Sequence, residues 1–187
     1  MEMGVIEAVL RGRRYSFLTA SGVFSRRRID NGTRLLVESM WVPGEGGLLD
    51  VGCGIGVIGI VAAATEPGLR ATLTDVNSRA TALAEANARR MGLGNVEVLT
   101  GDLYGPVGGR VFSTIVSNPP VSAGMRRVVE PLVSGAADHL EAGGLLQLVV
   151  QSNTGGRTVA GFLDRYFGGH EVVSRGGGYR VLAARRR

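Results

Sequence analysis

The pattern of apolar and polar positions along the chain is most informative over residues 48–60, which read LLDVGCGIGVIGI. An apolar run ends in an acid, three glycines follow at every second position, and apolar residues resume. This order predicts a buried strand, a tight turn and the start of a helix. Glycine allows the backbone to adopt φ > 0 or to lie against a ligand, and the helix start offers unpaired N–H groups. The segment therefore predicts a nucleotide-like cofactor site, in preference to a turn that only packs tightly.

Strands and helices are expected to alternate after this turn. Further apolar runs predict strands at residues 71–76, 96–100, 111–117 and 145–151. Helices are predicted to begin at Asn77 and to occupy much of residues 126–140. The alternation predicts an α/β fold with a mostly parallel sheet and right-handed crossovers. Residues 171–175 and 179–184 flank three glycines, which predicts a C-terminal hairpin with one antiparallel strand.

Residues 1–42 are interpreted as an N-terminal arm and a helix that belong to the same domain as the core formed by residues 43–187. Apolar and polar residues alternate along the arm, which predicts an extended segment or a short hairpin. Thr33 is expected to cap a short helix that ends before Pro43, with Trp41 as its packing anchor. The length of 187 residues suits one α/β domain better than two.

Composition argues against a membrane protein and a secreted, disulfide-bonded protein. Hydrophobic residues make up 44% of the chain, yet no apolar run reaches membrane-spanning length, so we expect no membrane partner. The N-terminus carries acids before its first arginine, unlike a signal peptide. Cys53 is the single cysteine and cannot form an intramolecular disulfide. These features together predict a cytoplasmic protein.

The charge is strongly basic, with a net charge of +5 and a pI of about 10.3. All 21 basic residues are arginines, which make planar, forked contacts to phosphate and can stack on bases. The clusters lie at residues 11–14, 26–28, 126–127 and 185–187. An RNA or DNA partner follows as a hypothesis. The alternative is a solvated basic surface in the product of a composition-biased genome.

Three acids fall at or just after the ends of successive predicted strands, where ligands bind in doubly wound sheets. They are Asp50, Asp75 and Asp102. At such a position Asp75 could accept both hydroxyls of a ribose, and Asp102 could accept from an adenine amine. Carboxylates also cap helices, which remains the alternative for either residue taken singly.

The sequence Ser117-Asn118-Pro119-Pro120 ends the fourth predicted strand. Proline fixes φ, and the residue before it is restricted to extended conformations, so Asn118 and Pro119 should be held stiffly. Their side-chain and main-chain carbonyls could then accept both hydrogens of one amino or amide NH₂ group. Such contacts would orient the nitrogen lone pair for methyl transfer without a strong base. An ordinary proline-rich loop is the alternative.

The pattern Asp50-x-Gly52-x-Gly54-x-Gly56 resembles the first motif of class I methyltransferases that use S-adenosylmethionine (SAM). A dinucleotide fingerprint would instead run its last glycine into the helix. The resemblance implies a Rossmann-like, seven-stranded sheet with helices on both faces and a turn that passes beneath SAM. The implied cofactor-binding residues are Asp50, Gly52, Cys53, Gly54, Gly56, Asp75, Val76, Asp102, Leu103 and Thr33.

Asn118-Pro119-Pro120 matches the N/D-P-P-Y/F motif of amino-group methyltransferases. Together with residues 22–25, 30–36 and 177–182, it is similar to the RsmC-like guanine-N2 methyltransferases. The resemblance implies catalytic roles for Asn118, Pro119 and Pro120. It also implies a substrate-binding role for three further residues, Phe24, Arg26 and Val121.

Two departures from the family pattern affect substrate recognition. Val121 stands where many relatives carry an aromatic residue, so stacking on the base would come from Phe24, Tyr15 or Phe17, or would be weaker. Bacterial RsmC-like proteins also carry a second copy of the fold upstream. RNA recognition here is therefore expected to use the arginine-rich arm or a dimer, and single-stranded RNA is the favoured substrate.

The sequence thus predicts a SAM-dependent RNA methyltransferase that acts on an exocyclic base amine, most specifically guanine N2 in ribosomal or transfer RNA. Methylation of a protein glutamine amide is the alternative among enzymes, and a non-catalytic RNA-binding module is the alternative from another class. His139 and His170 show no metal-ligand spacing, so no metal is expected. The protein is expected to be a monomer or a homodimer.

Overall fold

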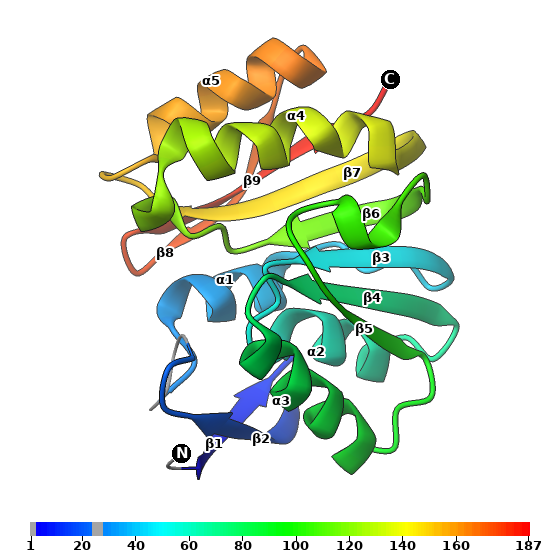
Figure 1. The fold of residues 1–187 in the computed structure, drawn as a ribbon. Helices are drawn as coiled ribbons and strands as arrows, with labels where there is room; N and C mark the ends of the chain where they lie inside the picture. Colours follow the sequence, from blue (N-terminus) through cyan, green and yellow to red (C-terminus); the bar gives the residue numbers. More distant parts are fainter. Residues whose placement is uncertain (1–2, 24–27) are drawn as a thin grey trace.

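The computed structural model describes residues 3–23 and 28–187, and its centre is a seven-stranded sheet (Figure 1). The strand order is β5-β4-β3-β6-β7-β9-β8. The strands are β3 (Gly46–Val51), β4 (Leu69–Asp75), β5 (Val96–Thr100), β6 (Phe112–Ser117), β7 (Leu140–Gln151), β8 (Glu171–Gly176) and β9 (Tyr179–Arg185). β9 runs antiparallel to both β7 and β8, and the other neighbouring strands of this sheet are parallel. The predicted parallel sheet with a C-terminal hairpin is therefore confirmed.

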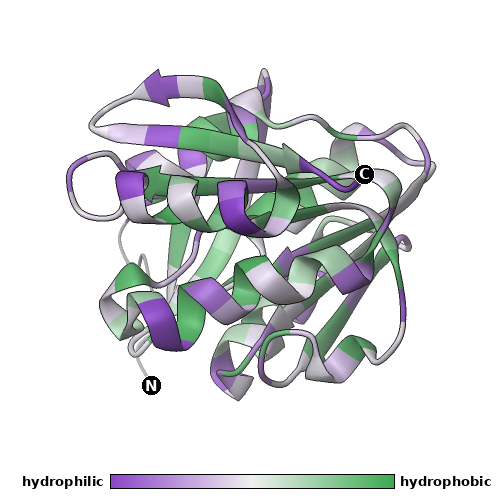
Figure 2. Ribbon diagram, turned by 90° about the horizontal axis from the view of Figure 1, so that it is seen from above, coloured by the Kyte–Doolittle hydropathy of each residue, from purple (hydrophilic) through white to green (hydrophobic). Residues whose placement is uncertain are grey.

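Helices cover both faces of the sheet, and each face has its own apolar core. One face carries α1 (Asn31–Ser39), α2 (Val57–Thr65) and α3 (Ser78–Arg90), and the other carries α4 (Glu130–His139) and α5 (Gly156–Phe167). Figure 2 shows the strands between these layers mostly in the colours of apolar residues, whereas several of the helices carry both polar and apolar residues. Burial on two sides explains the continuous apolar runs of the strands.

The N-terminal arm is a hairpin of β1 (Met3–Leu10) and β2 (Arg13–Ala20). Its rings Tyr15 and Phe17 are 3% and 0% exposed, in the same core as α2 and α3. The Asn87 amide of α3 binds both the N–H and the carbonyl of Leu18, at 2.7 and 3.1 Å. The hairpin prediction is confirmed. The expectation that Tyr15 or Phe17 could stack on a base is wrong, because both rings are buried.

Several local expectations were wrong. Asp30, not Thr33, caps α1, because its carboxylate accepts the Thr33 N–H at 3.0 Å. Trp41 is 50% exposed and anchors no core. The helix predicted over much of residues 126–140 is present, as a π-helix, Met125–Val129, followed by α4, whereas α5 was not predicted at all. The start of α5 has two glycines and no side-chain cap, so it lacks the usual sequence signal of a helix N-terminus.

The contact between α2 and the sheet depends on Asp50 and Gly59. Asp50 is fully buried at the end of β3, and its Oδ2 accepts the Gly59 N–H at 2.9 Å. Its Oδ1 has no hydrogen-bond partner among the described residues. A Cβ on Gly59 would lie 2.5 Å from Leu73 Cδ1, so glycine lets α2 approach β4 closely. Within the described part of the chain, no helix is long and apolar enough to cross a membrane.

Replacing Gly59 by alanine should destabilise the fold, because Leu73 is fully buried and cannot move away. We expect Gly59→Ala to lower the free energy of unfolding by about 1–3 kcal/mol, the usual cost of overpacking. An added Cβ on Gly161 of α5 would meet open space, so the matched variant Gly161→Ala should gain roughly 0.5–1 kcal/mol. Denaturant titration measures both values, and equal effects of the two variants would contradict this packing account.

Asp50 should make stability depend on pH. Burial raises the pKa of its carboxyl, the Gly59 N–H partly opposes the rise and the Asp75 charge adds to it, and together they bring the pKa from 3.8 to about 7. The folded chain then keeps a proton that the unfolded chain releases, so stability falls as pH rises from about 4 to about 7. The stability of Asp50→Asn relative to the wild type should therefore be greater at pH 8 than at pH 4, by up to about 4 kcal/mol. Denaturant titration across this range tests it, and parallel pH profiles would contradict it.

Candidate active site

A cavity of about 900 Å³ opens at the carboxyl ends of the central strands. Its lining includes Val51 at the end of β3, Asp75 at the end of β4, Asn118 after β6 and Gln151 at the end of β7. The strand order reverses between β3 and β6, and ligands bind at such switch points in open α/β sheets. The volume lies in the range of small-molecule and cofactor sites.

The glycine turn forms one wall of this cavity. Gly52 and Gly54 have φ values of 72° and 55°, and no atom lies within 4 Å of where a Cβ would stand. Their N–H groups donate to Thr74 O at 2.8 Å and to Asp75 Oδ2 at 2.9 Å, which fixes the turn on β4. The turn therefore presents bare, rigid backbone to a ligand. Gly56 differs, because it does not line the cavity and packs against Ile60.

The wall next to the turn combines carboxylates with apolar side chains. Asp75 accepts the N–H groups of Gly54 and Asn77, one on each oxygen, and a carboxylate has further lone pairs for two hydroxyls. Val76 is 72% exposed, and Leu103 adopts an unusual φ of 44° beside the exposed Asp102. All four side chains line the cavity. Their chemistry suits a ribose on Asp75 and an adenine ring between apolar groups near Asp102.

Of the two residues Asp50 and Cys53, only Cys53 lines the cavity. Asp50 lies outside the cavity lining and accepts a hydrogen bond from Gly59, so it fixes α2, the helix that follows the turn. Cys53 lines the cavity but is only 7% exposed. Burial raises the pKa of its thiol well above the usual value, and the Asp50 and Asp75 charges add to the rise. The thiol therefore stays protonated at neutral pH and does not act as a nucleophile.

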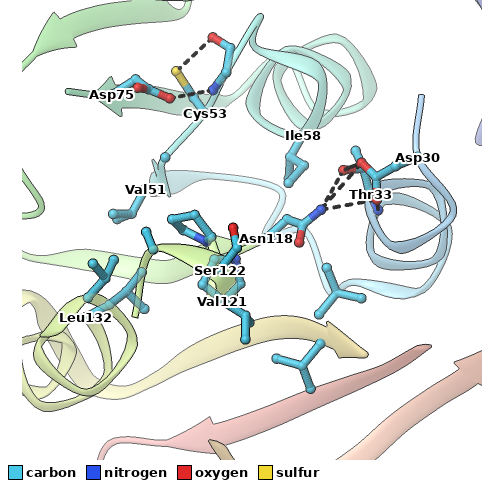
Figure 3. Close-up of a pocket in the computed structure, with 18 of the residues that line it drawn as sticks. Asp30, Thr33, Val51, Cys53, Ile58, Asp75, Asn118, Val121, Ser122 and Leu132 are labelled. Atoms are coloured by element: carbon cyan, nitrogen blue, oxygen red, sulfur yellow. Dashed lines mark hydrogen bonds between the residues drawn. The ribbon is translucent and has the colours of Figure 1, made fainter. Parts of the chain in front are cut away.

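The Asn118 amide is oriented by the start of α1 (Figure 3). Its Nδ2 donates to Thr33 Oγ1 at 2.9 Å and lies 3.3 Å from Asp30 Oδ1. The Thr33 hydroxyl in turn donates to Asp30 Oδ2 at 2.6 Å. An ionised carboxylate only accepts hydrogen bonds, so the NH₂ side of the amide must face Asp30. The Asn118 carbonyl oxygen is therefore left for a ligand in the cavity.

The backbone around Asn118 is fixed as well. The preceding Ser117 is fully buried, and its hydroxyl donates to Val51 O at 2.7 Å, which joins the ends of β6 and β3. Pro119 is buried, and its carbonyl accepts the Val121 N–H at 2.9 Å, leaving one lone pair. Pro120 is exposed at the cavity edge. The site thus holds two carbonyl acceptors of fixed position near the glycine turn.

The structure brings most of the predicted site residues to one cavity. Those that line it are Gly52, Cys53, Gly54, Asp75, Val76, Asp102, Leu103, Thr33, Asn118, Pro119, Pro120 and Val121. Asp50 and Gly56 lie behind it, and Phe24 and Arg26 fall outside the described residues.

Sequence reasoning did not name other residues of the lining as site residues, among them Asp30, Gln151 and Tyr179. Asp30 carried a signal, because an acid three residues before Thr33 is a common helix cap. Tyr179 lies in the segment 177–182 that contributes to the family resemblance, but no local pattern gave it a role in the site, and Gln151 carried no signal beyond its place at a strand end. Among the described residues, no group of three or more His, Cys, Asp or Glu side chains could hold a metal ion. His170 instead contacts Asp164 at 2.6 Å.

Comparison with known proteins places this geometry in a family. The family model of the methyltransferase small domain matches residues 14–183. The chain is 37% identical over 179 residues to YbxB of Bacillus subtilis, covering 95% of this chain and 89% of that protein. It is 38% identical over 169 residues to ribosomal RNA small subunit methyltransferase C of Sodalis glossinidius, covering 89% of this chain and 47% of that protein.

A solved structure matches nearly the whole fold. It is the 16S rRNA N2 G1207 methyltransferase RsmC of T. thermophilus in complex with AdoMet and guanosine, with a TM-score of 0.88 and 24% identity. The match covers 99% of this chain and 51% of that one, so the chain spans about half the length of the named methyltransferases it matches. The predicted class I methyltransferase fold is confirmed, and the chain belongs to the methyltransferase small domain family.

Proposed function

We propose that this chain is a SAM-dependent methyltransferase that modifies an exocyclic amine of an RNA base, specifically guanine N2 in ribosomal RNA. The observation that carries the proposal is the Asn118 amide, whose carbonyl oxygen is left for a ligand by the bonds to Asp30 and Thr33. Relatives named ribosomal RNA small subunit methyltransferase C and the RsmC complex with AdoMet and guanosine support this substrate. Residues 1–42 form part of the same domain in this proposal, since the hairpin shares its core.

The cofactor half of the cavity is formed by the glycine turn and the ends of β4 and β5. Asp75 would accept the ribose hydroxyls, while Val76 and Leu103 would contact the adenine and Asp102 its amine. The open space above Gly52 and Gly54 leaves room for the methionine part of SAM. When bound there, SAM supplies an electrophilic methyl group on its sulfonium. We place Thr33 near the methionine end, next to Asn118.

The acceptor amine would bind to carbonyl oxygens of this chain. Asn118 Oδ1 and Pro119 O each accept one of its N–H bonds, which fixes the nitrogen and directs its lone pair toward the cofactor. These acceptors also stabilise the positive charge that the nitrogen gains as it is methylated. The surplus proton then leaves to solvent, so no strong base is needed.

The charge of the chain favours RNA over a protein substrate. Exposed arginines lie on segments beside the cavity, at Arg28, Arg79, Arg126 and Arg127. The last two belong to the π-helix that also places Met125 in the cavity lining. Arginines around a cavity mouth suit the phosphates of single-stranded RNA. We propose a cytoplasmic location, where ribosomal RNA is found, and a monomer or homodimer.

Transfer of the methyl group from labelled SAM tests this function. Unmodified ribosomal RNA, transfer RNA and total protein would be offered separately, and the digested products analysed by mass spectrometry. We expect N2-methylguanosine in ribosomal RNA. Label in glutamine of protein alone would overturn the RNA assignment, and bound SAM with no transfer to any substrate would favour a binding module.

Asn118→Ala should lower kcat by roughly 10²–10³-fold, because it removes one of the two acceptors that hold the amine. The affinity for SAM, measured by calorimetry, should change little. Asn153 is exposed and does not line the cavity, so Asn153→Ala serves as the matched control and should keep wild-type kcat. Normal turnover of Asn118→Ala would remove Asn118 from the reaction.

Asp75→Ala should weaken SAM binding by roughly 10–100-fold, because hydrogen bonds to a charged group contribute more than those between neutral groups. Asp138 lies exposed on α4, away from the cavity, and Asp138→Ala should leave the affinity unchanged. Calorimetric titration with SAM compares the two variants. Equal affinities would mean that the ribose binds elsewhere.

A further inference from the structure

The cavity continues past Asn118 to the last residue of β7 and the first residue of β9. Gln151 and Tyr179 lie opposite each other there, paired across the two strands. The Gln151 amide nitrogen donates to the Tyr179 hydroxyl at 3.2 Å. Tyr179 is half-buried, and among the described residues it is the one aromatic side chain that lines the cavity.

The Tyr179 ring lies next to the group that orients Asn118. It covers Gly32, where an added Cβ would stand only 2.7 Å from a ring carbon. Gly32 precedes Thr33, whose hydroxyl accepts the Asn118 amide N–H. The glycine therefore makes room for the ring beside the proposed amine position.

The wall around position 121 offers no comparable surface. Val121 and Met125 line the cavity, and both approach Gly155, whose added Cβ would lie 2.8 Å from the Met125 methyl. This wall is aliphatic and tightly packed. Aromatic stacking on a base, which contributes strongly to nucleic-acid binding, must come from another side of the cavity.

The hydrogen-bonding edge next to the amine distinguishes the bases. With its N2 amine at Asn118, guanine presents the N1–H donor beside it, whereas adenine and cytosine present ring-nitrogen acceptors beside their amines. The Gln151 nitrogen is directed to Tyr179, and its carbonyl oxygen has no hydrogen-bond partner among the described residues. An acceptor of this kind favours a base with an N–H at that edge.

On the basis of the proposed function, we propose that Tyr179 and Gln151 form the subsite for the acceptor base. The Tyr179 ring packs on the base and replaces the aromatic residue that is missing at position 121. The Gln151 carbonyl accepts the guanine N1–H and thereby selects guanine. Both residues contact substrate and neither contacts the cofactor.

Steady-state kinetics with the RNA that the wild type methylates tests this subsite. Tyr179→Leu should raise the KM for RNA by roughly tenfold, the effect of losing one stacking ring, while the affinity for SAM stays unchanged. Tyr179→Phe keeps the ring and should stay within about threefold of the wild-type KM. The matched control is Tyr166→Leu, because Tyr166 binds Glu130 at 2.9 Å outside the cavity and its loss should leave KM unchanged.

Base selectivity provides the second readout, which a merely structural role would not change. Gln151 is exposed, so Gln151→Ala should fold normally, and it should reduce the preference for guanine over adenine in short oligonucleotides by roughly tenfold. Gln151→Glu keeps an acceptor and should retain the preference. This pair also tests the subsite if Tyr179→Leu fails to fold.

The outcomes separate the subsite from the function itself. An active wild type whose KM and base preference survive Tyr179→Leu and Gln151→Ala would overturn the subsite alone. A wild type that binds SAM but methylates no RNA would overturn the proposed function, and the subsite with it.

Discussion

The hydrogen bonds between Asn118 and the start of α1 are the constraint on which the site depends. They join the end of β6 to a helix cap 88 residues earlier, so the N-terminal part of the chain contributes to the candidate active site. Asp30 serves two purposes, because the same carboxylate caps α1 and fixes which face of the amide is free. The Asp30 carboxylate accepts hydrogen bonds, so the Asn118 nitrogen faces it and the Asn118 oxygen faces the cavity.

The glycines in and after the turn have two different structural roles. Gly52 and Gly54 leave space for a ligand, whereas Gly56 and Gly59 allow α2 to pack closely on the sheet. Asp50 receives a helix N–H but keeps a buried oxygen without a partner among the described residues, which makes it costly to ionise. The carboxyl group that holds α2 on the sheet therefore lies outside the cavity, while Asp75 supports the turn and lines the cavity.

Local patterns in the sequence predicted most of the sheet, and β5 was predicted with the bounds that the structure has. Strands that are buried on both sides appear in the sequence as apolar runs, so the number of strands and their order along the chain could be predicted. The missing helix α5 begins without a polar cap, and the burial of Tyr15 depends on contacts with α3 that no local pattern encodes. Asn118 was found from its prolines, but Tyr179 became a candidate only when folding brought β9 beside α1.

A crystal structure of this chain with S-adenosylhomocysteine and guanosine tests the central claim most directly. We predict Asn118 Oδ1 within about 2.7–3.2 Å of the guanine N2 nitrogen, with the amide nitrogen still on Thr33 and Asp30. A guanosine whose N2 lies away from Asn118, or an amide turned so that its oxygen faces α1, would contradict it.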